Sequence, residues 1–519
     1  MRTTSGLRGT LARVAAVLAV ATLLAFGATP AGAQDEPAAG GEAPAPAPAA
    51  APAAPAEGPT APGEMQPGVI EHGQAIEALR LGENLQAALY AWASISRSTP
   101  SAEKYESAQF ALGEALGRLG YEQASSEYFF EVARNRRTPA LLPRALAALD
   151  KLARRGLISD DQLMRGVLVE ADLGELPGDT ADFVHYYQGL ADIRSGLGRW
   201  VDRDFDEVKP DGFYGHQARY VRAVAKFNAG DTAGATKLLD EIVNGKGADK
   251  VTIARARLVR ARLLYEAKRN DEALAEYLQV KRTDVTQAGG ILLERAWARF
   301  RLGAYHDSMG MIYSLLAPSN RDLFLPEQYI LRGLIYQRFC HFRAAKSAVG
   351  DFRQRYGAAL DDVRLGKAPE DVPLVRAAAL ERPEVIPHNR IYQAVVRERA
   401  KLQEQRKLLL RGGLFDHLKK VYDSLEVQAG RSLGLALKTG AREVAEALLE
   451  AEEQANLLEY EVGVAIFRRV SDVSGRALTR AAAERVPRGG PKTYYKFDGE
   501  FWTDELPDMR FLIQDRCAE

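Results

Sequence analysis

Residues 258–280 read LVRARLLYEAKRNDEALAEYLQV, a pattern that predicts two short helices joined by a tight turn. Ala261 and Ala273 fall where the two helices would cross most closely, and Tyr265 and Tyr277 can fill the space beside them. A lone helix pair of this size leaves its apolar face exposed, because it has no neighbour to pack against. The stretch therefore predicts one unit of a larger all-α array.

The pattern around Ala273 recurs at spacings of about 34 to 40 residues, the period expected of stacked helix pairs. The matching second-helix positions are Ala88, Ala124, Met164, Val201, Ala235, Ser308 and Ala345. A larger residue follows most of them, namely Trp92, Tyr128, Phe205, Leu239, Tyr277, Ile312 and Val349. Glycine often marks the turn, at Gly82, Gly120, Gly196, Gly230 and Gly303. We expect repeat packing at the small residues Gly113, Ala124, Ala235, Ala261, Ala273, Ala296, Gly333 and Ala345.

These residues resemble the tetratricopeptide repeat, which has a small residue in its first helix, glycine and an aromatic at the turn, and alanine in its second helix. Gly303-Ala304-Tyr305 fits that turn, and Leu81-Gly82 leads to Ala88, Trp92 and Pro100. The resemblance covers 69–357 and implies an α-solenoid of about seven or eight repeats. It also implies a concave surface that binds peptides or protein segments, without catalysis. A helical array of another repeat type is the alternative.

Five arginines fall near first-helix positions, where they would line the inner groove of such an array. They are Arg260, Arg262, Arg295, Arg299 and Arg332. A groove of guanidinium groups would suit acidic segments. The alternative is a solvated outer face that binds nothing.

The N-terminus has the features of a signal peptide over residues 1–33. Arg2, Arg8 and Arg13 precede a short apolar run, and Ala31-Gly32-Ala33 offers a cleavage pattern. We expect a mature chain without a transmembrane segment, although a retained anchor is the alternative. Residues 34–68 are rich in Ala and Pro and predict a disordered linker, either a spacer or a solvated leader. The predicted location is secreted and periplasmic, in a Gram-negative envelope.

Beyond the repeats we expect a proline-containing connector at 358–389 and a bundle of long helices at 390–475. Apolar residues spaced three and four apart predict two stripes over 414–462. Gly430 and Gly440 are expected to separate the helices. Two or three helices packed together are the simplest account, and a homodimeric coiled coil that oligomerises the chain is the alternative.

The last stretch, 476–519, forms an aromatic and acidic tail. Phe501 and Trp502 stand among Asp498, Glu500 and Asp504. Large aromatic side chains at this density predict either a cap folded back on the helices or an exposed partner motif. The chain has two cysteines, Cys340 and Cys517, which in an exported protein permit one disulfide. Cys340 also suits a small buried turn position.

The chain carries equal numbers of basic and acidic residues, 69 each, so no overall field favours nucleic acid as a partner. The seven histidines are scattered and lack zinc spacing, and no phosphate-binding loop or nucleophile elbow is predicted. We expect no cofactor, no metal and no catalytic residue. The predicted function is a non-enzymatic envelope scaffold that binds other cell-envelope proteins or peptide segments. The alternative is a protein that binds or remodels peptidoglycan through the C-terminal tail.

Overall fold

The computed structural model describes residues 68–164, 168, 173, 175–195, 201–280, 288–320, 322–473 and 509–517. Within these ranges the chain is all helix, turn and loop, and contains no strand. The predicted all-α fold is confirmed. The predicted signal peptide, the linker and most of the C-terminal tail lie outside the described residues. None of the described helices combines the length and the hydropathy needed to cross a bilayer.

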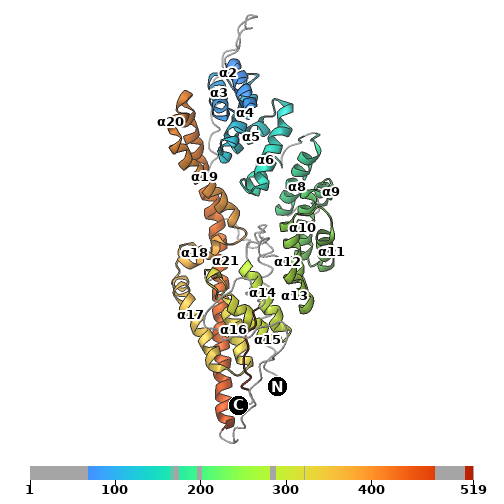
Figure 1. Ribbon diagram of the computed structural model, residues 1–519, viewed down its shortest axis with the longest axis vertical. Coiled ribbons are helices and arrows are strands. Elements are labelled where there is room, and N and C mark those ends of the chain that lie inside the picture. The colour runs from blue at the N-terminus through green and yellow to red at the C-terminus, as the bar shows by residue number, and fades with distance from the viewer. Residues whose placement is uncertain are drawn as a thin grey trace, which may run out of the picture. The chain divides into compact units, whose positions relative to one another are not determined.

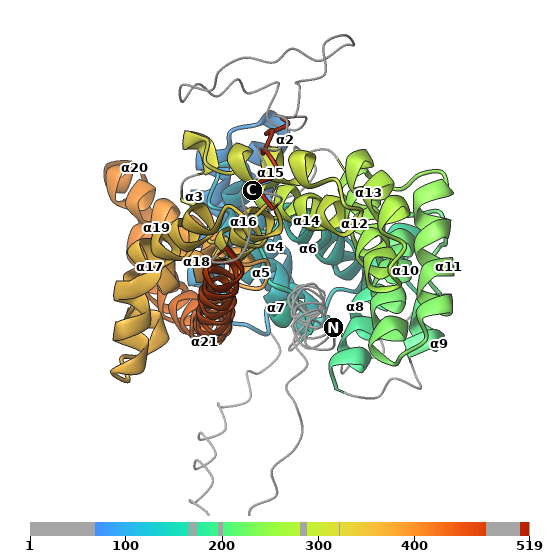
Figure 2. The ribbon, with the colours of Figure 1, turned by 90° about the horizontal axis from the view of Figure 1, so that it is seen from below.

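Within the described residues, the helices from α2 to α17 follow one another two by two in chain order. The pairs are α2 (Val69–Leu81) with α3 (Asn84–Arg97), α4 (Tyr105–Arg118) with α5 (Glu122–Asn135), α6 (Leu142–Arg154) with α7 (Asp160–Met164), α8 (Gly178–Arg194) with α9 (Val201–Asp206), α10 (Phe213–Asn228) with α11 (Thr232–Asn244), α12 (Lys250–Glu266) with α13 (Asn270–Gln279), α14 (Ala288–Arg301) with α15 (Tyr305–Ser314), and α16 (Glu327–Arg338) with α17 (Phe342–Arg364). Single-turn 3₁₀ helices η2 (Pro139–Leu141) and η4 (Pro318–Asn320) lie between pairs. Figure 2 shows α10 to α13 side by side, as the stacked pairs of a solenoid should be.

A single turn geometry joins the helices of most pairs. In the α14–α15 turn, the N–H of Gly303 donates to Phe300 at 3.1 Å and that of Ala304 donates to Arg299 at 2.9 Å. These two hydrogen bonds close the C-terminal end of the first helix. They require a residue in the left-handed backbone conformation, which Gly303 adopts at φ 77°. Lys268 and Cys340 hold the same position in their own pairs at φ 64° and 58°. The pattern therefore continues where glycine is missing.

The small residues predicted to carry repeat packing are all buried. A Cβ atom on Gly113 would stand 3.0 Å from the Phe129 ring, so a larger residue would push the two helices of that pair apart. At Gly333 a Cβ atom would approach Leu458 to 2.4 Å. The helix crossings therefore require side chains this small.

The chain divides into two compact units, each made of two stretches of sequence. The N-terminal unit takes the described residues up to 180 together with 393–427, and the C-terminal unit takes 181–392 together with the described residues from 428 onward. This division differs from the predicted array at 69–357 and separate bundle at 390–475. The cause is the long C-terminal helices, which pack on helical pairs as well as on one another.

After the pairs come η5 (Pro369–Asp371), α18 (Pro373–Leu380), α19 (Ile386–Glu404), α20 (Arg406–Leu409), η6 (Arg411–Gly413) and α21 (Leu414–Val473). The helix α21 is 60 residues long and passes through Gly430 and Gly440, so the predicted break at these glycines is wrong. A Cβ atom on Gly440 would lie 2.9 Å from Val385, which shows that this glycine permits close packing. Figure 1 shows α21 as one continuous helix.

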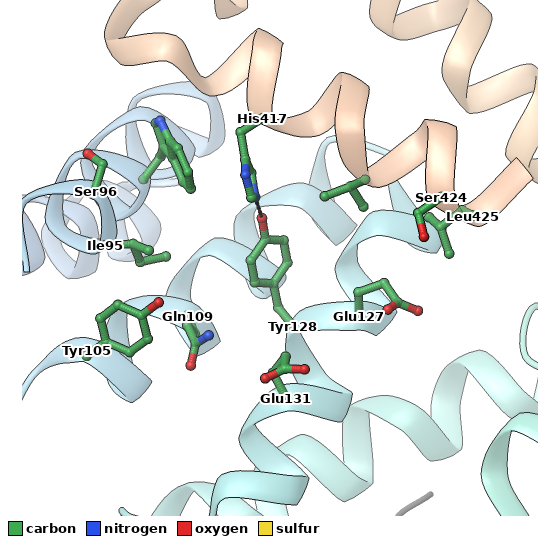
Figure 3. Close-up of a pocket in the computed structure, with 12 residues that line it drawn as sticks. Ile95, Ser96, Tyr105, Gln109, Glu127, Tyr128, Glu131, His417, Ser424 and Leu425 are labelled. Carbon is green, nitrogen blue, oxygen red and sulfur yellow. Dashed lines mark hydrogen bonds between the residues drawn. The ribbon is translucent and has the colours of Figure 1, made fainter. Parts of the chain in front are cut away.

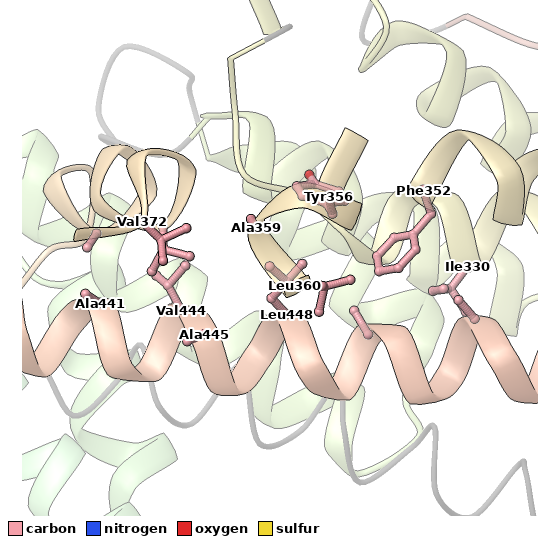
Figure 4. Packing of buried hydrophobic residues seen from close by; sticks show 14 of the residues in the cluster. Ile330, Phe352, Tyr356, Ala359, Leu360, Val372, Ala441, Val444, Ala445 and Leu448 are labelled. Atoms are coloured by element: carbon pink, nitrogen blue, oxygen red, sulfur yellow. The ribbon is translucent and has the colours of Figure 1, made fainter. Parts of the chain in front are cut away.

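In the C-terminal unit, α21 completes the core of the last helical pair. Val444, Leu448 and Leu458 are buried against Phe352 and Leu360 of α17, in one cluster with residues of α16 and α18 (Figure 4). In the N-terminal unit, the start of α21 buries Leu414, Leu418 and Leu425. The chain thus covers both predicted stripes itself. Within the described residues this burial leaves those positions unavailable as a coiled-coil seam, and oligomerisation through 414–462 stays a prediction.

Candidate functional site

A pocket of about 470 Å³ opens in the N-terminal unit between the first two helical pairs and the start of α21 (Figure 3). Its walls come from α3, α4, α5 and α21. The lining residues are Trp92, Ile95 and Ser96 of α3, Tyr105 and Gln109 of α4, Glu127, Tyr128 and Glu131 of α5, and His417, Val421, Ser424 and Leu425 of α21. The volume is within the range of small-ligand and side-chain pockets.

Three aromatic side chains of this pocket are held by contacts with one another. The Tyr128 hydroxyl and Nε2 of His417 lie 2.7 Å apart, and the Trp92 ring stacks on His417 with centroids 4.0 Å apart. The indole N–H of Trp92 donates to the carbonyl of Gly412 at 2.8 Å. His417 thus contacts both other rings, and Trp92 has a further hydrogen bond, so these contacts restrain the rotamers. The aromatic wall is therefore formed before any ligand arrives.

The polar side of the pocket offers hydrogen-bond acceptors. Gln109 is only 8% exposed, and among the described residues its Oε1 has no hydrogen-bond partner. The carboxylate of Glu127 likewise has no hydrogen-bond or ion-pair partner within the described chain. Glu131, one turn further along α5, is paired with Arg134 at 2.7 Å. No lysine or arginine stands among the lining residues.

Burial controls the protonation of the pocket. It raises the pKa of the Glu127 carboxyl, and the neighbouring Glu131 adds to this while Arg134 opposes it. Burial also lowers the pKa of His417, and the nearby Lys420 lowers it further, so the imidazole is neutral at pH 7. Burial raises the pKa of Tyr128, which therefore keeps its proton. The protonated Tyr128 hydroxyl can therefore donate a hydrogen bond to the neutral imidazole of His417.

The helices that form the pocket are joined beside it by a buried carboxylate. Oε2 of Glu398, on α19, accepts from the backbone N–H of Gln123 at 2.9 Å and from the Tyr422 hydroxyl at 2.7 Å. Burial raises the pKa of Glu398 to about 7. This carboxyl connects α5, α19 and α21, and so it positions two of the four pocket walls.

The arginines expected to line a groove are instead engaged in ion pairs within the array. Arg260 pairs with Asp240 at 2.5 Å and also with Glu276, Arg262 pairs with Glu294 at 2.7 Å, and Arg332 pairs with Asp351. Their side chains are 10 to 15% exposed. At these three described positions the charge is already balanced, which agrees neither with a groove for acidic segments nor with a solvated face.

The other two arginines of that set lie on α14. Arg295 is buried and Arg299 is half-buried. Phe501 and Trp502, also expected to bind a partner, lie outside the described residues. The predicted partner-binding residues are therefore not brought together in one described site.

The described part of the tail, 509–517, lies against the C-terminal unit. The N–H of Phe511 donates to the carbonyl of His306 at 3.0 Å, and the Phe511 ring stacks on Tyr313 with centroids 4.1 Å apart. Ile513 is buried in the core of the α14–α16 helices. Cys517 forms a disulfide with Cys340, the left-handed residue of the α16–α17 turn. This segment folds back on the helices, one of the two arrangements that the sequence left open.

One motif outside the pocket has the spacing of a catalytic site, but its place in the described structure does not fit that chemistry. Residues 430–434 read GRSLG, a nucleophile-elbow spacing that the sequence analysis overlooked, and the Ser432 hydroxyl lies 2.8 Å from Nδ1 of His388. A nucleophile elbow requires a sharp turn between a strand and a helix, whereas Ser432 lies inside α21. The helix interior uses its own backbone N–H groups, so they cannot form an oxyanion hole. In the described residues no group of three His, Cys, Asp or Glu side chains is placed to hold a metal.

Sequence reasoning missed the pocket because it assigned Trp92 and Tyr128 to repeat packing. Both stand four residues after the small second-helix position, in two successive pairs. Large aromatics at one register in adjacent repeats are the signal that could have indicated a shared face. No such signal marks His417, which lies 289 residues from Tyr128 in the sequence.

Comparisons with known proteins add little beyond this description. No family model matches the chain, and no curated protein matches it. A solved tetratricopeptide repeat protein from Parabacteroides merdae is 14% identical, with 55% of this chain and 92% of that one covered and a TM-score of 0.24. The apo form of RapI is 12% identical, with 71% and 98% covered and a TM-score of 0.27. The tetratricopeptide-like character of the chain rests on its own paired helices, turns and buried crossing residues.

Proposed function

We propose that this protein is an exported, non-catalytic scaffold of the cell envelope, which binds a segment of another protein in the pocket of α3, α4, α5 and α21. The observation that carries the proposal is the pocket itself, in which fixed aromatic rings stand beside acceptor groups that lack partners. Buried aromatic pockets of this kind are typical anchor points in protein interfaces. Stacked helix pairs provide a rigid frame for such a pocket.

Two features support export to an oxidising compartment. The N-terminal residues have the order of a secretory signal, with arginines, an apolar run and small residues before Gln34. The Cys340–Cys517 disulfide suits the periplasm, because the cytosol keeps such pairs reduced. The expected mature N-terminus is Gln34, which mass spectrometry of the protein from a periplasmic fraction will test. An intact Met1 terminus in a cytosolic fraction would contradict this part of the proposal.

Site-specific photo-crosslinking tests the binding function. A photoreactive phenylalanine analogue at Ser96, an exposed residue of the pocket, should capture a discrete partner when the full chain is expressed in its own host. The matched control is the same analogue at Gln86, which is exposed on the same helix and outside the pocket. The captured protein is then purified and tested for direct binding. Equal crosslinking at both positions would overturn the assignment of this pocket.

A further inference from the structure

We infer that the pocket of the N-terminal unit recognises an arginine side chain presented by a segment of the partner protein. This inference rests on the proposed function, and it specifies the chemistry of the bound residue. The geometry points to it through three features, which are unpaired acceptors, aromatic faces and an apolar rim.

The acceptors come first, because they determine the charge of the guest. Glu127 and Gln109 both present oxygen atoms that no described residue engages, on adjacent helices α5 and α4. Figure 3 shows Gln109 between Tyr105 and Tyr128, with Glu127 beyond Tyr128. An oxygen acceptor that is shielded from water and has no partner destabilises the fold through its lost hydration. A guest with several N–H donors would restore the missing hydrogen bonds. Since the lining has one carboxylate outside any ion pair in the described chain, Glu127, and no cation, the complementary guest is positively charged.

The aromatic rings favour a planar cation. Trp92, Tyr105 and Tyr128 line the pocket, and two of them are held by His417. A guanidinium group stacks on aromatic faces and carries five donors in a fixed plane, so it can bond to a carboxylate and an amide oxygen at once. An ammonium group is more strongly hydrated and forms no such fork. These properties favour arginine over lysine.

The apolar rim indicates that the cation belongs to a protein segment rather than to a free small molecule. Ile95, Val421 and Leu425 border the pocket on α3 and α21. The methylene stem of an arginine and its neighbouring residues can cover these side chains. A free guanidinium compound would leave Val421, the half-buried member of this rim, uncovered.

The test uses the full chain labelled with 5-fluorotryptophan and observed by fluorine NMR. The sequence has four tryptophans, and the resonance of Trp92 is assigned with Trp92→Phe. The probes are acetylated pentapeptide amides that carry arginine, lysine or citrulline between alanines. Citrulline has the shape of arginine without its charge. We expect the arginine peptide to shift the Trp92 signal, with millimolar affinity, and to bind roughly tenfold more tightly than the citrulline peptide.

Matched variants identify the acceptor. Glu127→Gln should weaken arginine binding by roughly tenfold. Glu83→Gln removes the same charge from an exposed residue of the same unit, outside the pocket, and should leave binding unchanged. The unliganded Trp92 signal and the melting temperature show whether each variant remains folded. Equal affinity for the lysine or citrulline peptide, or unchanged binding by Glu127→Gln, would overturn the inference.

The scaffold function and the arginine assignment can be contradicted separately. A partner that crosslinks at position 96 and binds the pocket without using an arginine leaves the scaffold function standing and removes the arginine assignment. Binding of methylguanidinium as tightly as the arginine peptide contradicts a protein segment as the source. Crosslinking of a second copy of this chain would replace the partner protein with self-association.

Discussion

Two surfaces of the helical pairs differ in whether the chain itself covers them. In the C-terminal unit, the surface beside α15 and the α16–α17 turn is covered by residues 509–517 of the chain itself. In the N-terminal unit, the surface on α3 and α5 forms an open pocket. Each surface includes second helices of pairs, α15 in the first case and α3 and α5 in the second. The covered surface shows that this array can hold an extended chain, and the open one is where we propose that a separate chain binds.

The two surfaces also differ in the chemical groups that they present. The covered surface works through the backbone and apolar contacts: a Cβ atom on Gly310 would lie 1.8 Å from the carbonyl oxygen of Met509, so only glycine lets the segment approach. Ile513 supplies the buried apolar anchor. The open pocket instead presents Glu127 and Gln109 as acceptors. A chain held permanently uses shape and a covalent bond, whereas the pocket offers polar groups that a transient guest can engage.

The largest expected effect comes from opening the disulfide. Cys517→Ser should lower the free energy of unfolding of the oxidised protein by roughly 2–5 kcal/mol, because the bond closes a loop of 177 residues in the unfolded chain. Urea denaturation measures the change. The wild type treated with a reductant serves as control and should match the variant. An unchanged midpoint would mean that the segment is held without its covalent bond.

The next effect tests the close approach of the covered segment. Gly310→Val should cost about 1–3 kcal/mol through overcrowding and should expose residues 509–517 to proteases. Limited proteolysis with mass spectrometry reports the release. Gly350→Ala, at a helical glycine of α17 with open space around its Cβ position, is the matched control and should leave the segment protected. Protection in both variants would show that the segment does not need Gly310.

A pH-dependent effect should appear at the carboxyl that holds the walls of the open pocket. Folding raises the pKa of Glu398 to about 7, so the folded state binds this proton more tightly than the unfolded state. Its contribution to stability is present below the ordinary carboxyl pKa and is lost as the pH rises through about 7. Glu398→Gln keeps an acceptor for Gln123 and Tyr422 and does not titrate.

We therefore expect Glu398→Gln to gain stability relative to the wild type as the pH rises from about 5 to 8, on the order of 1 kcal/mol. Urea denaturation across this pH range measures the difference. Parallel pH profiles of Glu398→Gln and wild type would contradict the prediction.

The smallest effect concerns ligand binding in the open pocket. Acid should weaken the arginine peptide several-fold as the pH falls through the raised pKa of Glu127, because the carboxylate loses its charge. Protonation of His417, below its lowered pKa, acts in the same direction. The other titratable groups of the lining are Glu131, Tyr105 and Tyr128. Fluorine NMR titrations at several pH values measure the change, and tighter binding in acid would contradict it.

The sequence predicted the fold correctly where the interactions are local and recur from one helical pair to the next. The small residues Ala261 and Ala273, the turn glycine Gly303 and the period between them predicted an array of helical pairs, since each pair repeats the same contacts with its neighbours. It failed at Gly440, because helix propensity alone favours a break there. In the folded protein Val385 packs against that glycine, and the close contact compensates for the weak propensity.

The sequence by itself determined the all-helical class, the repeat period, the small crossing residues and the candidate cysteine pair. Each follows from residue spacing or composition, which local physics converts directly into structure. The tertiary structure alone decided that α21 packs on the helical pairs, that Arg260 and Arg332 are neutralised by carboxylates, and that Tyr128 meets His417. These outcomes depend on contacts between distant parts of the chain. No local pattern encodes them, because the contact that forms is the one that buries both partners in the completed fold.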